Sequence, residues 1–153
     1  MTDPQAISMR EARRDDVAAI VALLADDHLG ATREDPAALP AYSAAFDKID
    51  ADPRNVLAVA EAAGRIVGTL QITFIPGLSN QGAELALLEA VRIDSSLRGQ
   101  GLGRVMIEWA MDQARARGCR AMELFTHNSR EAAQRFYEQL GFEKTHAGMR
   151  RAL

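Results

Sequence analysis

The sequence reads Arg98-Gly99-Gln100-Gly101-Leu102-Gly103-Arg104 at the junction of two regular apolar patterns. Leu85–Ile93 before it is typical of a buried strand, and Leu102–Arg117 after it has the periodicity of an amphipathic helix. Three alternating glycines remove Cβ atoms at this turn, so backbone N–H groups can approach a ligand closely. The helix start adds unsatisfied N–H donors and the positive end of the helix dipole, and an arginine stands at either end of the stretch. The stretch therefore predicts an anion site, for a phosphate in particular.

Two common phosphate-binding motifs do not fit this stretch. The dinucleotide pattern G-x-G-x-x-G, begun at Gly99, would place its third glycine at Arg104, and the Gly-Lys-Ser/Thr ending of a P-loop does not occur. The stretch does match Arg/Gln-x-x-Gly-x-Gly/Ala through Arg98, Gly101 and Gly103. With this pattern it resembles the pyrophosphate loop of the GNAT superfamily, the acetyl-CoA-dependent N-acetyltransferases. A tight turn with a purely structural role is the alternative.

A second motif follows downstream. Ala121–Thr126 predicts a buried strand, and after Asn128 a helix carries Phe136-Tyr137. Ser129 is a suitable N-cap for this helix, and Leu140-Gly141-Phe142 ends it and restarts an extended segment. This order of elements resembles the second GNAT signature: a strand, an asparagine, a helix that carries Phe-Tyr, and Leu-Gly-Phe. The resemblance covers roughly residues 85 to 145, and the order and separation of the two motifs agree with the family.

The remaining patterns predict one domain over residues 1–153. The fold class that the resemblance implies is α/β (α+β), a GNAT fold with a mixed central β-sheet of six to seven strands, splayed central strands and four flanking helices. The other expected strands are 7–12, 55–62, 66–75 and 84–93, with a last pair at 142–146 and 149–153. The other expected helices run from Asp15 or Asp16 to about Ala25 and from Pro36 to about Ile49.

The composition of the chain argues against several classes of function. The chain has 153 residues, 18 basic against 21 acidic, and a net charge of −3, which gives no electrostatic footprint for nucleic acid. A single cysteine, Cys119, excludes an internal disulfide and suits a reducing cytoplasm. No apolar run reaches transmembrane length, and three scattered histidines offer no metal-ligand spacing. We expect a cytoplasmic protein that binds neither membrane nor metal.

The resemblance implies how acetyl-CoA would bind. The pantetheine arm would pair with backbone groups of Val91, Arg92 and Ile93, where one N–H would polarise the thioester carbonyl. The pyrophosphate would lie on the amides of Gly99, Gln100, Gly101, Leu102, Gly103 and Arg104. The side chain of Asn128 would contact the arm. The alternatives are core packing for the strand residues and a turn-forming role for the asparagine.

Tyr137 is the candidate general acid, and the resemblance also places it among the residues that bind acetyl-CoA. A thiolate leaving group has a pKa near ~8.5 and a phenol near ~10, so a tyrosine can protonate the thiolate at small cost. Phe136 and Leu140 share one face of the helix, which lets Phe136 anchor it while Tyr137 points elsewhere. A partly buried packing tyrosine is the alternative.

The general base has three candidates. Glu89 stands within an otherwise apolar strand, where a carboxylate costs energy unless it is hydrogen-bonded or faces a cleft. It also matches a position where many GNAT members carry a glutamate. Glu123, on the neighbouring strand, resembles the proposed base of ribosomal-protein alanine acetyltransferases. The third alternative is that neither serves and that water removes the proton.

The acceptor amine is less well specified. In this fold the acceptor pocket is built largely by the first two helices, their loop and the strand hairpins. The loop contains Asp26, Asp27, His28, Glu34 and Asp35, which either attract a cationic amine or form a solvated acidic surface. Tyr42, Phe46 and Phe74 either line the pocket or fill the core.

The sequence thus predicts an N-acetyltransferase that moves an acetyl group from acetyl-CoA to a primary amine of a small molecule or peptide. We expect direct transfer in a ternary complex, because a small buried hydrophobe is the expected role of Cys119 rather than a covalent acyl carrier. The alternative is a non-catalytic acyl-CoA-binding or sensor module of the same fold. GNAT proteins are commonly dimers, so a homodimer is a further expectation.

Overall fold

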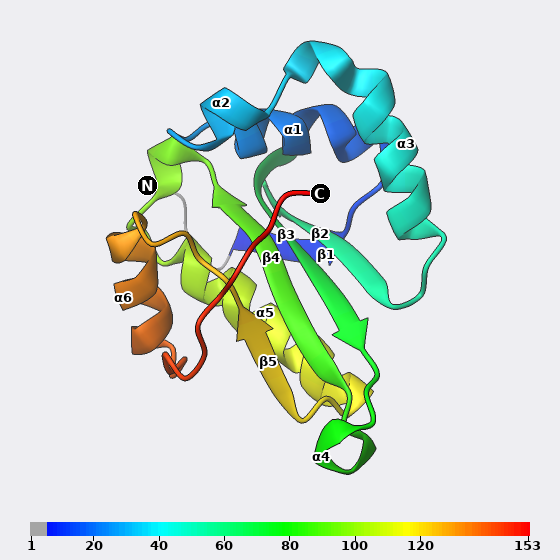
Figure 1. The fold of residues 1–153 in the computed structure, drawn as a ribbon. Helices are drawn as coiled ribbons and strands as arrows, with labels where there is room; N and C mark the ends of the chain where they lie inside the picture. Colours follow the sequence, from blue (N-terminus) through cyan, green and yellow to red (C-terminus); the bar gives the residue numbers. More distant parts are fainter. Residues whose placement is uncertain (1–5) are drawn as a thin grey trace. The chain divides into compact units, whose positions relative to one another are not determined.

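One mixed β-sheet organises the chain (Figure 1). The computed structural model describes residues 6–153, in which five strands follow the order β1-β2-β3-β4-β5. The first four pair antiparallel, and β5 runs beside β4 in the same direction. Their bounds are Ile7–Glu11, Asn55–Ala62, Arg65–Ile75, Leu85–Ile93 and Ala121–Leu124. The chain divides into two compact units, one ending at Glu123 and the other comprising Leu124–Leu153. The single domain over residues 1–153 stays a prediction.

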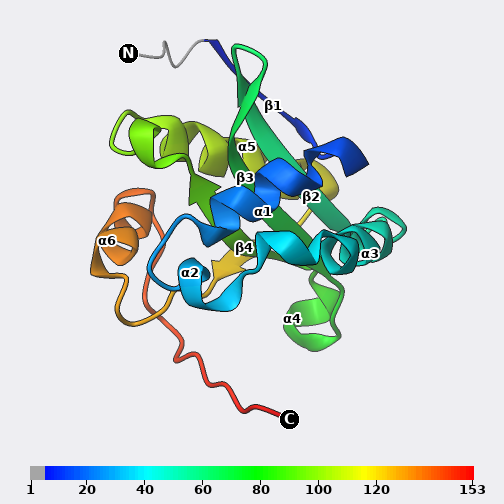
Figure 2. The same cartoon turned by 90° about the horizontal axis from the view of Figure 1, so that it is seen from above.

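The helices of the first unit lie on both faces of the sheet. α1 (Val17–Ala25) and α3 (Leu39–Asp50) cover one face, and α5 (Leu102–Arg117) covers the other (Figure 2). Successive side chains of β3 point alternately to these two faces, as they do in any β-strand. A Cβ added at Gly68 would meet the sulfur of Met106 on α5 at 2.6 Å, whereas Thr69 and Gln71 line a pocket with α1 and α3.

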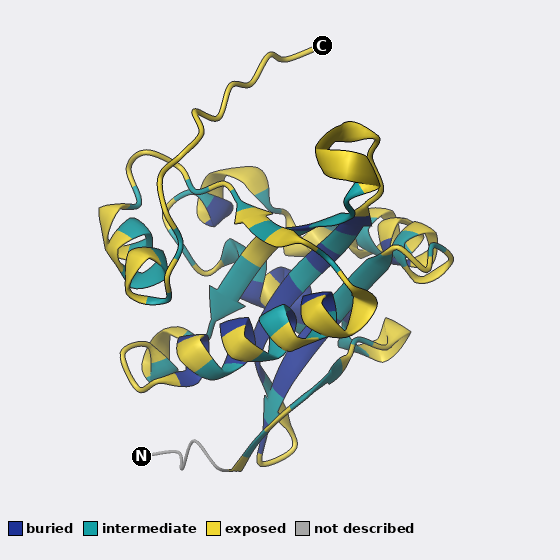
Figure 3. Cartoon of the chain, turned by 90° about the horizontal axis from the view of Figure 1, so that it is seen from below, coloured by how far each residue is buried: buried dark blue, intermediate teal, exposed yellow. Residues whose placement is uncertain are grey.

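The core forms where the two helical layers meet the sheet. Leu70, Ile72 and Leu88 are almost completely buried, as are Met106 and Ile107 of α5. Figure 3 shows the buried segments concentrated in the central strands and the helices against them. Burying these side chains is the main favourable contribution to folding. The core therefore fixes the positions of β3, β4 and α5, and the glycine-rich stretch connects β4 to α5.

A β-bulge interrupts β4 near its end. Gln71 pairs with Glu89 but Thr69 pairs with Arg92, so Leu70 stands opposite two residues. One of them, Ala90, has a φ of 53°, in the left-handed region that few residues other than glycine adopt. An extra residue of this kind bends a strand and re-aims its side chains.

The number of strands predicted was wrong. The structure has five strands, because residues 142–146 and 149–153 form none. Between Thr145 and Arg151 only Ala147 and Met149 are apolar, and every residue there is exposed. Such a segment has no apolar face that pairing could bury. β5 also ends at Leu124, two residues before the predicted Thr126.

Residues 6–153 form six α-helices, where four helices were predicted. α1, α3, α5 and α6 (Glu131–Gln139) correspond to the predicted four. The other two, α2 (Gly30–Arg33) and α4 (Ser79–Gly82), have four residues each. Segments this short carry no helical periodicity that a sequence pattern could reveal. Among residues 6–153, no helix is both long enough and apolar enough to cross a bilayer.

Candidate functional site

Glycines with left-handed backbones open the N-terminus of α5. Gly99 has a φ of 75°, and Gly101, the N-cap residue, has a φ of 87°. No atom lies within 4 Å of the position that a Cβ would take at either residue, so the space above both is open. No side chain caps the helix, which leaves first-turn N–H groups without intrahelical partners. This is the geometry of an anion site at the start of a 16-residue helix.

Both arginines of this loop have partners within the chain. The guanidinium of Arg98 donates to the carbonyl oxygens of Asp26 at 2.9 Å and Ile93 at 3.3 Å. Arg104 lies 3.4 Å from the carboxylate of Glu108, one turn further along α5. Arg98 therefore fixes the loop as well as adding positive charge beside it.

A short turn precedes the loop and is held by Asp94. Its carboxylate accepts hydrogen bonds from the hydroxyl and the N–H of Ser96 at 2.7 and 2.9 Å. These bonds, the hydroxyl first, hold the pKa of Asp94 below its ordinary value. Gln100 adds a hydrogen bond from its amide to the carbonyl of Ser96 at 2.9 Å. The path from β4 to α5 is thus fixed by local contacts.

The last residues of β4 are half-buried. Among Val91, Arg92 and Ile93, the arginine side chain turns toward the loop after α1, where its Nε lies 2.9 Å from Asp27 Oδ2. Only 16% of the Arg92 side chain and 9% of the Asp27 side chain are exposed. The other oxygen of Asp27 accepts the N–H groups of Leu29 and Gly30. Arg92 therefore connects β4 to the α1–α2 loop.

The carboxylates of the acidic loop have partners inside the chain. Asp27 pairs with Arg92, and Asp26 Oδ2 lies 3.9 Å from Arg98. Glu34 accepts the hydroxyl of Tyr42 at 2.8 Å, and Asp35 accepts the N–H of Ala37 at 3.0 Å. These four carboxylates are therefore used to shape the loop, which the sequence pattern alone could not show.

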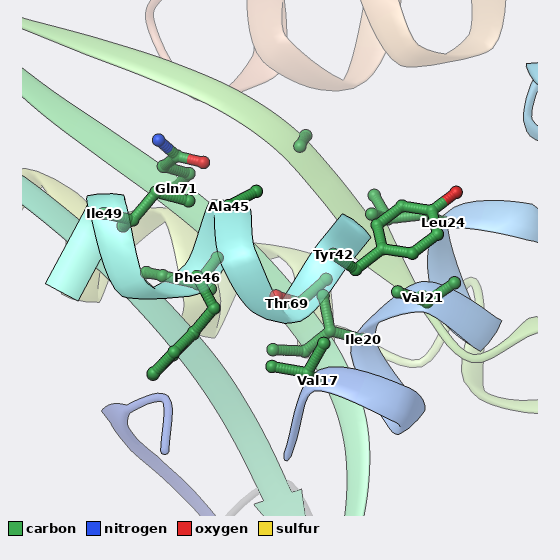
Figure 4. Close-up of a pocket in the computed structure, with 12 residues that line it drawn as sticks. Val17, Ile20, Val21, Leu24, Tyr42, Ala45, Phe46, Ile49, Thr69 and Gln71 are labelled. Atoms are coloured by element: carbon green, nitrogen blue, oxygen red, sulfur yellow. The ribbon is translucent and has the colours of Figure 1, made fainter. Parts of the chain in front are cut away.

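A pocket opens between α1, α3 and the sheet (Figure 4). It has a volume of about 110 Å³, and Tyr42 and Phe46 line it, whereas Phe74 does not. The ring of Phe74 faces α5, where the guanidinium of Arg117 lies 4.4 Å from its centroid. The remaining lining residues are Val17, Ile20, Val21, Leu24, Ala45, Ile49, Leu57, Thr69, Gln71 and Ala90.

Both candidate bases are exposed. Glu89 pairs with Gln71 across the ladder, and residues opposite each other in antiparallel strands share a face. Its carboxylate therefore stands on the face that carries the pocket, and the expectation of a buried strand over residues 85–93 does not hold at this residue. The bulge begins directly after it. Glu123 is exposed on β5.

The second unit contains Asn128 and Tyr137. Tyr137 is half-buried on α6, with its ring centroid 5.3 Å from Phe136 and 5.8 Å from Phe142, the latter edge-on. Asn128 is exposed in the turn before the helix. The predicted N-cap at Ser129 is wrong, because Arg130 occupies that position and the Ser129 hydroxyl lies 2.8 Å from the ring of His127.

Two features of the site were missed. The positive φ of Ala90 has no sequence signal, since alanine gives no reason to expect one. The Asp27–Arg92 ion pair joins residues 65 positions apart, too far for a helical or strand spacing to reveal. The available signal was Arg92 itself, because a charged residue inside the apolar β4 pattern needs a partner.

Similarity to known proteins agrees with this geometry. A model of the acetyltransferase (GNAT) family matches residues 17–142. A glucosamine 6-phosphate N-acetyltransferase of Trypanosoma brucei brucei is 36% identical over 87 residues, which are 57% of this chain and 57% of that enzyme. The match thus spans little more than half of that relative's length.

Solved structures are similar over almost the whole chain. A protein of Bacillus halodurans C-125 described as a transcriptional regulator has a TM-score of 0.92 and 42% identity, with 96% of this chain and 99% of that chain covered. A protein of Clostridium acetobutylicum described as a predicted acetyltransferase, solved with acetyl-CoA, has a TM-score of 0.75 and 19% identity over 95% and 96% of the two chains, which shows the fold alone. Because the family model matches most of its length, this chain belongs to the acetyltransferase (GNAT) family.

Proposed function

We propose that this protein transfers the acetyl group of acetyl-CoA directly to a primary amine held in the same complex. The observation that carries the proposal is the uncapped N-terminus of α5, with open space above Gly99 and Gly101. An anion placed there meets N–H donors and the positive end of a long helix. Membership of the acetyltransferase family supports the identification of that anion as the pyrophosphate of acetyl-CoA.

The residues present fit this cosubstrate. Amides from Gly99 to Arg104 would hold the pyrophosphate, and backbone groups of Val91–Ile93 would pair with the pantetheine arm, which Asn128 would also contact. When bound, acetyl-CoA supplies an activated thioester. Preorganised N–H donors aimed at a developing oxyanion are worth about 3–4 kcal/mol each, so a backbone amide of β4 is the proposed electrophilic group.

Proton transfers are assigned to side chains. Tyr137 is proposed to give its phenolic proton to the leaving thiolate. Glu89 is the first candidate to take a proton from the amine, directly or through water, because its exposed carboxylate shares a sheet face with the pocket. Glu123 and water alone are the alternatives.

Direct transfer is favoured over an acyl-cysteine. Cys119 is half-buried, and burial, followed by the charge of Glu84, raises the pKa of its thiol above the ordinary value. Since the thiolate is the nucleophile, a raised pKa lowers its reactive fraction at neutral pH. The amine is then the group that attacks the thioester.

Calorimetric titration tests the donor. We expect acetyl-CoA and CoA to bind and NAD not to bind. Gly101→Glu should abolish this binding, because a carboxylate beside the α5 N-terminus repels the pyrophosphate. Gly64→Glu is the matched control: Gly64 has a φ of 74° and equally open surroundings but lies in the β2–β3 turn. Unchanged acetyl-CoA affinity in Gly101→Glu would contradict the proposal.

A second candidate function is a non-catalytic acyl-CoA-binding module. The observation that favours it is the 42% identical protein described as a transcriptional regulator. Thiol release from acetyl-CoA in the presence of primary amines separates the two functions. Release that depends on the amine establishes the enzyme, whereas tight binding of acetyl-CoA without any release establishes the module.

A further inference from the structure

We propose that the acceptor is a monoamine whose carbon skeleton is apolar, and that this skeleton occupies the pocket between α1 and α3. The inference rests on the proposed function and specifies its substrate class. It starts from the lining: nine of the twelve residues have purely apolar side chains, and the other three are Tyr42, Thr69 and Gln71. No charged side chain lines the pocket.

The three polar side chains already have hydrogen-bond partners. Thr69 donates to the carbonyl of Ala58 at 2.9 Å, inside the sheet. The Tyr42 hydroxyl donates to Glu34 and accepts the N–H of Asp35. The Gln71 amide donates to Asn55 Oδ1 at 3.4 Å. Of these side chains only the Gln71 amide, which has a second N–H and a carbonyl oxygen, offers several hydrogen-bonding positions. A ligand with many hydroxyl groups would therefore bury most of its polar atoms without compensation, which is unfavourable.

The same reasoning excludes phosphorylated acceptors from the pocket. A phosphate needs arginine, lysine or free N–H donors, and none of the lining side chains is cationic. The relative from Trypanosoma brucei brucei is named for glucosamine 6-phosphate. We infer that this chain differs from that enzyme in its acceptor.

The size of the pocket limits the apolar group. A cavity of about 150 Å³ lined by Leu, Ile and Phe in another protein takes up benzene. The volume here, about 110 Å³, is smaller, and the pocket is partly open to solvent. One ring or a short branched chain therefore fits, with the rest of the molecule outside.

The pocket also lies beside the part of β4 to which the acceptor's amine must be directed. Ala90 belongs to its wall, and the neighbouring residues Glu89 and Val91 are the proposed base and the start of the proposed pantetheine segment. A ligand whose apolar end is buried against α1 and α3 can direct its amine along this part of β4. Figure 4 shows Ala45, Phe46 and Ile49 of α3 around the pocket, with Gln71 on the sheet side.

The experiment compares acceptors and pocket variants. Kinetics with 2-phenylethylamine and 3-methylbutylamine are set against glucosamine 6-phosphate and spermidine. We expect kcat/KM for the two apolar monoamines to be at least about tenfold higher. Ala45→Phe, which fills the pocket from α3, should reduce their kcat/KM about tenfold, chiefly through KM. Ala44→Phe is the matched control, since Ala44 is the exposed neighbour on α3 outside the lining, and should change it less than about twofold.

Two further readouts separate this inference from the proposed function. Calorimetric titration of 2-phenylethylamine into the CoA complex measures acceptor binding without turnover, and absence of binding overturns the inference. Calorimetry with acetyl-CoA tests the donor independently, and both phenylalanine variants should retain its affinity. Bound acetyl-CoA with preferred turnover of the phosphate or the polyamine would leave the proposed function standing and refute the apolar acceptor. Equal activity of Ala45→Phe and Ala44→Phe would also refute it.

Discussion

Ala90 places a left-handed backbone in the middle of a strand. The residue makes Leu70 face two partners and turns β4 where the proposed thioester segment begins. From the sequence this position looked like part of a regular buried strand, because its neighbours are apolar and alanine has no turn preference. The site residues were therefore named from motifs, while the backbone feature between them could not be foreseen.

The strain at Ala90 can be measured. Ala90→Val should lower the free energy of unfolding by about 1–3 kcal/mol, since a β-branched residue tolerates a positive φ poorly. Ala90→Gly should cause no such loss, because glycine adopts this φ freely. Urea unfolding of the two variants checks the difference. Equal stability of both variants would mean that the positive φ is not retained in solution.

Tyr137 is testable because its packing can be kept while its proton is removed. Tyr137→Phe retains the ring that lies against Phe136 and Phe142. We expect kcat to fall about a hundredfold or more, as for the loss of a general acid, with acetyl-CoA affinity unchanged. Steady-state kinetics across pH, with calorimetry beside them, measure both. An unaltered kcat and pH profile would remove Tyr137 from the mechanism.

At the level of elements, prediction succeeded where a pattern is long and ends in a clear signal. The bounds of α5 were predicted as Leu102–Arg117 and are confirmed, because helical periodicity over 16 residues stops at Gly118, which has a φ of 85°. The β2–β3 hairpin is confirmed for the same reason, with its turn at Gly64. Prediction failed for the short α2, which was not expected, and for the two C-terminal strands, which were expected but do not form. A few residues contain too little periodicity to distinguish a helix or a strand from a coil.

The contact between β4 and the α1–α2 loop depends on one buried ion pair. Arg92→Leu should lower the free energy of unfolding by about 3–5 kcal/mol, because it leaves the carboxylate of Asp27 buried without its charged partner. Arg115→Leu is the control: its ion pair with Asp112 is exposed, so its loss should matter little. Urea unfolding measures both. A similar small effect for the two variants would show that the buried pair does not hold the loop.

At the level of the molecule, the proposed donor site and the proposed acceptor site are built in different ways. The proposed donor site is local in sequence and consists largely of backbone, so a motif revealed it. The proposed acceptor pocket is assembled from α1, α3, β2, β3 and β4, whose residues are distant in sequence. Its apolar character therefore emerged only from the structure, although Tyr42 and Phe46 had been named as possible lining.

Donor binding should be visible in the stability of the whole protein. Acetyl-CoA at about 100 times its Kd should add about 2.7 kcal/mol, because it binds the native state alone. For a chain of this size that corresponds to a rise in Tm of about 5–10 °C. Thermal unfolding with acetyl-CoA, and with NAD at the same concentration, measures the rise. No shift with acetyl-CoA, or an equal shift with NAD, would contradict a specific donor site.

The open space above Gly99 and Gly101 also determines how this loop can change by mutation. A phosphate held by main-chain amides does not depend on the side chain that stands between the two glycines, so a change at codon 100 costs the loop only the hydrogen bond from the Gln100 amide to the carbonyl of Ser96. Codons 99 and 101 are more restricted, since every change that replaces either glycine by another residue adds a Cβ to a left-handed backbone. A saturation library of this loop, selected for donor binding, would therefore keep two invariant positions around a variable one. What the proposed donor site requires at positions 99 and 101 is the absence of a side chain.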